Sequence, residues 1–433
     1  MNWYLNRFSS LILLLLSVSC CAGQDITALK SEFIRGYSQL NIPEYVYDYR
    51  QYFGSIPSDE SLQRQQTFFW NMVQKTAAVN AESLSDQQRL VLETIKYETT
   101  FNLERLELER KWVQQGRSFP VDGLHTLTDS KEWYSYFIKK FTTVTIAPEE
   151  VFRFGEAEVQ RVSNEIGRLY KALHLNDDTA RDYLKRKVFL LEDEEEVVRG
   201  FIKVDSIVRK HLHLFVSVGE LPALYPMKWP DAGQFTPPGI YLNHTHNPYG
   251  KDVFMYNFYG GRFNKRAMEW IYMHEGIPGH HLQSSLRQPD SLYEMFVYPG
   301  NFEGWACYVE DYGQVLGLYT DPYSELGKWE WDLVRSARLV VETGIHYYGW
   351  TKDEALKYWK QHVPGQEDIA EREITRVSNW PGQALSYKVG AKHILEMQEA
   401  WAQDHPGENL SVFRNAYLNC GMTPLTVIVQ ILK

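Results

Sequence analysis

Hydrophobic residues recur at helical spacing along most of the chain. Between about residues 25 and 225, apolar positions among charged ones follow a period near 3.6, most clearly in residues 87–110 and 148–175. Pro148 followed by two acidic residues is typical of a first helical turn. The helical pattern returns after about residue 262 and continues to the C-terminus, interrupted near prolines and Pro-Gly pairs. The chain is therefore predicted to be mainly α-helical.

Residues 222–262 break this pattern. Proline and glycine cluster there, residues 240–243 (IYLN) are typical of a short strand, and the following NPYG segment is typical of a turn. We find no internal repeat. We expect one helical domain over residues 24–433, with an N-terminal part of about residues 24–221 and a C-terminal part of about residues 222–433. A small β-sheet with an edge strand should lie in the second part.

The first 23 residues are predicted to be an export signal. Arg7 is followed by a leucine-rich run at residues 11–16, which is too short to cross a bilayer as a helix, and then by small residues. Cys20 or Cys21 could carry a lipid, although neither fits a lipoprotein box well, and cleavage after Gly23 without a lipid is the alternative. The mature protein should be periplasmic or lipid-anchored in the cell envelope. No later stretch reaches about 18 continuous apolar residues, so any membrane contact is expected through that anchor alone.

Composition narrows the classes of function. The 433 residues are 44% hydrophobic and 23% charged, which is typical of a globular protein, and the formal net charge is −10. No Lys/Arg-dense stripe is present, so we expect no nucleic-acid partner. Four cysteines are too few for a disulfide framework, and Cys307 and Cys420 could be bridged or free. The oligomeric state stays open.

The strongest chemical signal lies at the end of a helix predicted over residues 264–277, which leads into HEGIPGHHLQ at residues 274–283. A His-Glu pair on a buried helix, with further histidines downstream, is typical of zinc hydrolases. The usual motif places the second histidine four residues after the first, where this chain has Pro278. Interior or capping histidines are the alternative interpretation.

The second histidine ligand depends on how the helix is deformed. In a regular helix His280 would lie about 240° around the axis from His274, and His281 would lie about 10.5 Å further along it. Because Pro278 and Gly279 favour a bulge, we predict that His280 returns to the metal face. His281 is the alternative ligand. If it does not bind the metal, we expect it to hydrogen-bond a metal ligand or to contact the substrate.

Glu303 is the predicted third ligand. It stands in FEGWACY at residues 302–308, an apolar stretch that is far enough from His274 for a second helix to begin. Two imidazoles and one carboxylate leave zinc an open position.

These motifs resemble those of the bacterial domain-of-unknown-function family 885, a group of zincin-like proteins placed with the metallopeptidases. The resemblance runs from about residue 145 to the end through seven motifs. They are TIAPEEV (145–151), GEAEV (155–159), HEGIPGHHLQ (274–283), EGWA (303–306), RSARLVVETGIH (335–346), GWT (349–351) and PGQALSYKVG (381–390). The chain departs from the family in a shorter N-terminal half, in Glu342 where Asp is commoner and in Arg414 where His is commoner. The resemblance implies a large helical zincin-like metallopeptidase fold of gluzincin type that binds Zn²⁺.

If zinc binds at these ligands, catalytic roles can be assigned to the neighbouring residues. Glu275 would act as general base toward a metal-activated water. Tyr387 and His346 are the candidate oxyanion donors, by analogy with helical metallopeptidases, and a core tyrosine and a core histidine are the alternatives. The strand at residues 240–243 resembles the edge strand along which zincins bind a peptide. Arg338 and Arg376 could hold a substrate carboxylate or form ion pairs.

We therefore predict an exported zinc peptidase acting on peptide substrates. The alternatives are a non-catalytic peptide-binding envelope lipoprotein and a zinc hydrolase of a non-peptide amide or ester.

Overall fold

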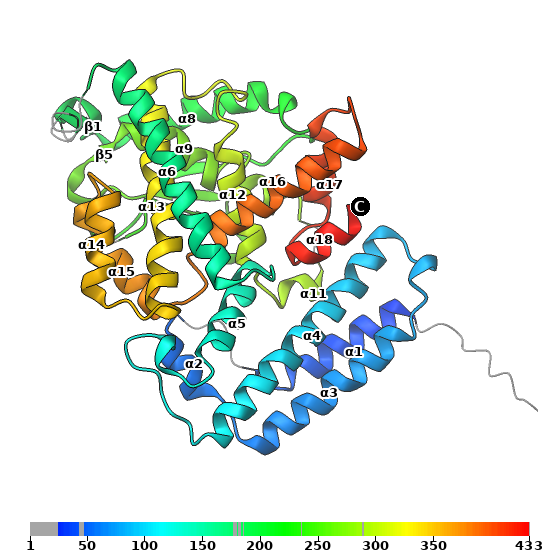
Figure 1. The fold of residues 1–433 in the computed structure, drawn as a ribbon. Helices are drawn as coiled ribbons and strands as arrows, with labels where there is room; N and C mark the ends of the chain where they lie inside the picture. The colour runs from blue at the N-terminus through cyan, green and yellow to red at the C-terminus, as the bar shows by residue number, and fades with distance from the viewer. Residues whose placement is uncertain are drawn as a thin grey trace, which may run out of the picture.

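The computed structural model of the chain describes residues 25–42, 47–175, 180, 183–184, 186–234, 236–287 and 290–432. The predicted export signal, with Cys20 and Cys21, lies outside these residues. The described chain is mainly helical with two small sheets (Figure 1). The prediction of a mainly α fold with a small sheet is therefore confirmed. No helix in these ranges is both long and apolar enough to cross a membrane.

Long amphipathic helices make up the N-terminal part. α1, α3 and α4 lie side by side at one end of the molecule, and α5 leads from them toward the remaining helices (Figure 1). The α4 N-terminus is closed by a capping box, in which the Ser85 hydroxyl and the Gln88 side chain each bond the other residue's backbone N–H. The helices of this part are α1 (Ile26–Ser38), α2 (Tyr49–Ser55), α3 (Asp59–Ala77), α4 (Asp86–Gln114), α5 (Ser130–Thr142), α6 (Pro148–Ala172) and α8 (Glu194–His211).

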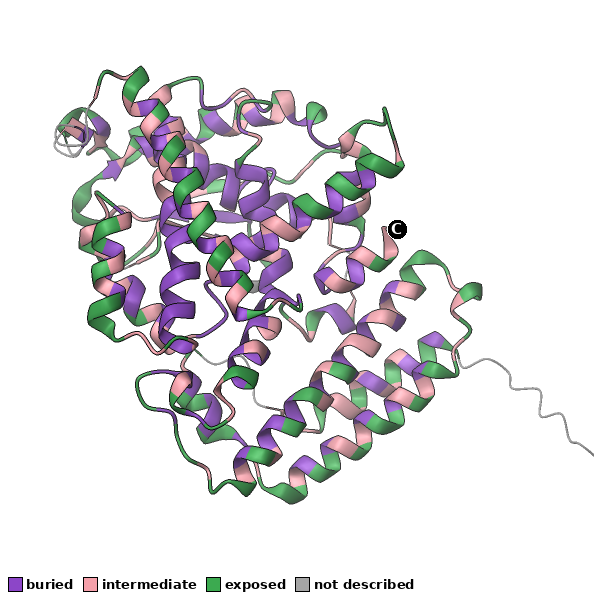
Figure 2. Cartoon of the chain, in the orientation of Figure 1, coloured by how far each residue is buried: buried purple, intermediate pink, exposed green. Residues whose placement is uncertain are grey.

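The C-terminal part packs its helices around α13, in which every residue from 332 to 346 is buried (Figure 2). α13 runs along α6, so helices on the two sides of the predicted boundary near residue 222 share a hydrophobic core. The domain division itself stays a prediction. The helices of this part are α9 (Met268–Glu275), α10 (His280–Ser285), α11 (Ser291–Glu294), α12 (Pro299–Glu310), α13 (Pro322–His346), α14 (Lys352–His362), α15 (Ala370–Asn379), α16 (Ser386–Asp404), α17 (Leu410–Asn419) and α18 (Leu425–Ile431).

A three-stranded sheet lies between these helices in the order β2-β4-β3. The central strand β4 (Val253–Tyr256) pairs parallel with β2 (Tyr225–Lys228) and antiparallel with β3 (Gly239–Leu242). The strand predicted at residues 240–243 is thus found one residue earlier, and it is an edge strand as expected. β2 and β4 were not predicted, and neither was the second sheet, which pairs β1 (Leu190–Leu191) with β5 (Phe263–Asn264).

α12 and α16 cross at an unusually close backbone contact. A Cβ atom added to Gly304 would lie 2.7 Å from the Cα atom of Gly390, so both positions leave no room for a side chain. This contact explains two glycines in the EGWA and YKVG motifs. It brings Glu303, on α12, close to the start of α16, where Tyr387 lies.

Candidate metal centre

The HEGIPGHH segment forms two short helices with a tight turn between them. α9 ends at Glu275 and α10 begins at His280, so the predicted continuous helix with a bulge is wrong in form. The turn passes through a cis Ile277–Pro278 bond, and a Cβ atom on Gly279 would overlap the carbonyl oxygens of residues 273 and 274. The indole N–H of Trp305 donates to the Pro278 carbonyl at 2.8 Å, which fixes the turn to α12.

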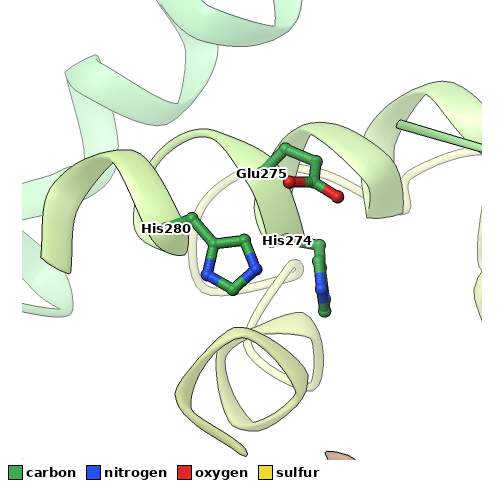
Figure 3. A group of neighbouring side chains, drawn as sticks. All are labelled: His274, Glu275 and His280. Atoms are coloured by element: carbon green, nitrogen blue, oxygen red, sulfur yellow. The ribbon is translucent and has the colours of Figure 1, made fainter. Parts of the chain in front are cut away.

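The helix break has the same effect as the predicted bulge, because it brings His280 back beside His274. The rings of His274 and His280 lie 4.8 Å apart at an interplanar angle of 78° (Figure 3). Both rings are buried. The His280 ring stacks on the Phe302 ring with ring centres 3.7 Å apart, which holds its orientation. Ligand atoms of His274, Glu275 and His280 lie within 4.8 Å of one another, so this buried His/Glu cluster could hold a metal ion.

Glu303 meets both histidines through one oxygen. Its Oε2 lies 3.3 Å from His274 Nε2 and 3.5 Å from His280 Nε2. Two atoms bonded to one tetrahedral zinc ion are separated by about 3.3–3.5 Å, because each bond is about 2.0–2.2 Å long. The distances from Glu303 to the two predicted histidine ligands therefore fit such an ion.

The electrostatics of the cluster reflect its burial and its ion pairs. Burial opposes the charge on Glu303, but hydrogen bonds from His274 and His280 outweigh it and hold the pKa of that carboxyl well below its usual range. Burial likewise opposes a charge on His274, whose pKa is nevertheless raised by its hydrogen bonds with Cys307, Glu303 and Glu310.

Behind His274 lies a second ion pair that was not predicted. Glu310 Oε1 lies 2.7 Å from His274 Nδ1, and Glu310 Oε2 accepts from Arg335 Nη1 at 2.7 Å. A carboxylate on one imidazole nitrogen leaves the other nitrogen free to bind metal and fixes the ring orientation. The signal was present in the sequence, since Glu303, Cys307 and Glu310 follow i, i+4, i+7 spacing and share one face of α12.

Cys307 belongs to an alternative metal group with His274 and Glu310. A thiol must lose its proton to bind zinc, whereas burial raises the pKa of Cys307. Glu310 is already paired with Arg335. The group containing His280 is therefore the better candidate. Cys307 and Cys420 are both free, which answers the question of a disulfide between them.

A cavity of about 310 Å³ opens beside the cluster. His274, Glu275 and Tyr387 line it, together with Gly239 on the free edge of β3. The backbone N–H of Tyr241, on the same strand, donates to Glu275 Oε2 at 2.8 Å. The carboxylate predicted as general base is thus anchored to the sheet edge and faces the cavity.

Tyr387 stacks parallel to His274, with ring centres 6.2 Å apart. Its hydroxyl oxygen accepts from Arg376 Nη2 at 3.4 Å, which leaves the phenolic hydrogen available for another acceptor. Burial, helped by the charge of Glu303, raises the pKa of Tyr387, so the phenol stays protonated near neutral pH. Tyr387 can therefore act as a hydrogen-bond donor in the cavity.

Comparison with known proteins agrees with these motifs. The sequence profile of a family described as "Bacterial protein of unknown function (DUF885)" matches residues 107–432, which include the ligand cluster and Tyr387. The chain belongs to the DUF885 family. No curated protein matches this DUF885 chain.

Two solved structures share its fold. A protein from Colwellia psychrerythraea, provisionally described as a lipoprotein, is 20% identical with a TM-score of 0.67, covering 94% of this chain and 74% of its own. A protein from Shewanella oneidensis, provisionally described as a lipoprotein of unknown function, is 16% identical with a TM-score of 0.59, covering 94% of this chain and 87% of its own. At these identities the likeness extends to the fold alone.

His346 is not among the residues that line the cavity of the DUF885 protein. Its Nδ1 accepts from the Leu124 N–H at 3.2 Å and its Nε2 donates to the Val377 carbonyl at 2.8 Å, so backbone groups occupy both nitrogens. Burial lowers its pKa to about 4. The predicted oxyanion role for His346 is therefore corrected to a structural one.

His281 points toward the sheet. Its Nε2 lies 3.0 Å from the Pro222 carbonyl oxygen, and its ring packs against Tyr241 with centres 5.5 Å apart. The structure thus brings His280, and not His281, to His274 and Glu303.

Proposed function

We propose that this DUF885 protein is a zinc-dependent peptidase in which His274, His280 and Glu303 hold the metal and Glu275 is the general base. The observation that carries the proposal is the convergence of two imidazoles on one oxygen of Glu303, with Glu275 beside them on the cavity wall. When bound, a zinc ion acts as a Lewis acid, which polarises a carbonyl group and lowers the pKa of water toward neutral pH.

The protein's own groups would do the rest. Glu275 is oriented through Oε2 by the Tyr241 N–H, which leaves Oε1 to take a proton from the attacking water and pass it to the leaving amine. The Tyr387 hydroxyl would donate to the oxygen that gains negative charge. β3 is an edge strand, and the part of its outer edge beyond the Tyr241 N–H, which is bonded to Glu275, would bind an extended peptide by strand addition. This favours a peptide over a compact amide or ester.

An envelope location forms part of the proposal. It is supported by the leucine-rich N-terminal segment of the chain and by the provisional description of both similar structures as lipoproteins. Cell fractionation with intact-mass measurement tests this location. An acyl mass on Cys20 or Cys21 is expected for an anchored form, and a chain beginning unmodified at Gln24 contradicts the anchor.

The decisive experiment digests a peptide library with the purified protein, before and after chelation, and follows the fragments by mass spectrometry. Cleavage that stops with chelator and returns with zinc supports a peptidase. Binding without cleavage favours the peptide-binding lipoprotein, and turnover of only non-peptide amides or esters favours the third interpretation.

Glu275→Gln should retain stoichiometric zinc and lose about 10³-fold or more of turnover, because the base is removed without changing the ligands. Glu269→Gln is the matched control, since Glu269 lies on the same helix and also accepts a backbone N–H, from Tyr319 at 2.7 Å, but does not line the cavity. Loss of zinc from Glu275→Gln would make Glu275 a ligand and contradict its role as base.

Zinc content after dialysis separates the two candidate histidines. His280→Ala should lose the metal, and His281→Ala should keep it, because only His280 lies against Glu303. The reverse result would remove His280 from the ligand set.

A further inference from the structure

One wall of the cavity carries more positive than negative charge. Arg338 on α13 donates to Glu373 Oε2 at 2.7 Å, and Arg372 on α15 donates to Glu373 Oε1 at 2.6 Å. Arg376 lies one turn further along α15 and also lines the cavity. Three guanidinium groups therefore lie at this wall beside the carboxylate of Glu373, which bonds two of them.

Arg376 differs from the other two arginines because no described carboxylate bonds it directly: Glu373 and Glu303 act on it only electrostatically, from a longer distance. It donates to Gln383 Oε1 at 2.5 Å and to the Tyr387 hydroxyl at 3.4 Å, and both acceptors are neutral. Within the described ranges it forms no ion pair with a carboxylate. A guanidinium that is partly removed from water and has no directly bonded carboxylate can still gain from one, so this position favours a bound anion.

The anion would lie close to the reaction centre. The guanidinium carbons of Arg338 and Arg376 lie 5.6 and 5.7 Å from the centre of the Tyr387 ring, and that ring lies 6.2 Å from the ring of His274. An extended peptide spans about 3.3–3.6 Å per residue. A carboxylate held by these arginines would therefore be one or two residues from the bond placed at the metal.

We propose that Arg338 and Arg376 bind the C-terminal carboxylate of the substrate, so that the enzyme removes residues from the C-terminal end of peptides. This inference rests on the proposed peptidase function. Arginine matches a carboxylate because its planar N–H groups can form two parallel charge-assisted hydrogen bonds. Trp270 and Trp331, which stack at 5.4 Å in the same cavity, would contact the side chain of the terminal residue.

The reaction needs no further reactant. The C–N bond of the peptide breaks, the hydroxyl of water joins the carbonyl carbon, and the proton passes to the nitrogen of the released C-terminal fragment. An internal Asp or Glu side chain offers the same carboxylate chemistry, so the experiment includes it. The small cavity favours the chain end, because a pocket of about 300 Å³ is at the lower limit for ligand sites.

Binding is measured first, on the zinc-loaded Glu275→Gln variant, so that cleavage does not interfere. Three sets of N-acetylated hexapeptides are compared by equilibrium dialysis: free C-terminal acids, the same sequences as amides, and amides containing internal Asp or Glu. The acids should bind about 30-fold or more tightly than either set of amides. Adding Arg376→Gln should reduce this preference to near one. Adding Arg161→Gln should preserve it, since Arg161 is paired with Glu158 and does not line the cavity.

Equal binding of acids and amides, or no binding of either, overturns the inference. Amides with internal acidic residues binding as tightly as the acids would assign the arginines to a side chain and overturn it as well.

Cleavage by the wild-type protein then separates this inference from the proposed function. Release of one or two residues from the C-terminus of the acids, with the amides cleaved at least about 30-fold more slowly, supports both. Preferred binding of acids without any cleavage would contradict the peptidase and leave the carboxylate site standing. Equal cleavage of acids and amides would keep the peptidase and overturn the site.

Discussion

Two buried Arg–Glu pairs, one in each part of the molecule, have nearly the same geometry and different surroundings. Arg105 and Glu109 on α4 meet at 2.6 Å, and Arg335 and Glu310 meet at 2.7 Å across α13 and α12. All four side chains are at most 2% exposed. The distances alone do not reveal which pair belongs to the candidate metal centre.

The difference lies in the remaining polar atoms. Arg105 also donates to Gln65 and Asn102, and Glu109 accepts from the Tyr52 hydroxyl, so the other partners of this closed pair are all neutral side chains. Glu310 instead bonds His274 Nδ1 through Oε1, the carboxylate oxygen that does not bond Arg335 Nη1. A buried pair whose other partners are neutral can serve the fold alone, whereas a buried pair that extends to an imidazole of the candidate metal centre connects the fold to that centre.

Breaking the closed pair should give the largest effect, and on stability alone. Glu109→Gln leaves Arg105 buried without a counter-charge, so the free energy of unfolding should fall by about 3–5 kcal/mol. Chemical denaturation measures this, and zinc content of the folded fraction should not change. A zinc loss there would show that the two networks are coupled.

Two tyrosine substitutions test the same difference between the candidate metal centre and the Arg105–Glu109 pair. Tyr387→Phe should lower kcat by about 100-fold with little change in stability, because it removes one hydrogen-bond donor to the developing oxyanion. Tyr52→Phe, in the closed network, should instead cost about 1 kcal/mol of stability and leave kcat unchanged. An unchanged kcat in Tyr387→Phe would make Tyr387 a core tyrosine.

The smallest effect on function is expected where the second pair would support the metal, and Glu310→Gln should also cost stability as Glu109→Gln does, because it leaves Arg335 without its counter-charge. Glu310→Gln should weaken zinc affinity by about 10–100-fold, since the partner that orients His274 loses its charge. Competition with a chelating dye of known affinity measures the change, and Glu109→Gln is the matched control. Equal zinc affinity in the two variants would reduce Glu310 to a purely structural role.

Much of this site could be predicted because its residues lie in short motifs. Glu303 was predicted from its apolar surroundings and His280 from the need to deform the helix at Pro278, and the fold brings both to His274. The form of the deformation was not predictable, because a complete helix break depends on Trp305 holding the turn from another element. Arg335 was missed because its partner lies on a different helix, and only the fold brings them together.

The sheet was only partly predictable for a related reason. β4 is a continuous apolar run buried on both faces, and such a run cannot be distinguished from a helix segment by its period. β2 contains Pro226, which argues against a strand in sequence although an edge position tolerates it. His346 was misplaced because a histidine near a motif arginine does not reveal which face of α13 it occupies.

The contact between Gly304 and Gly390 has a consequence for how the site can evolve. Here, as at Gly300 and Gly382, backbone lies directly on backbone, so no change of side-chain rotamer can absorb a substitution. One added methyl group would move α12 and α16 apart and carry Glu303 and Tyr387 with them. A variant at either glycine would therefore displace the proposed ligand and the proposed hydrogen-bond donor together, although neither glycine lines the cavity.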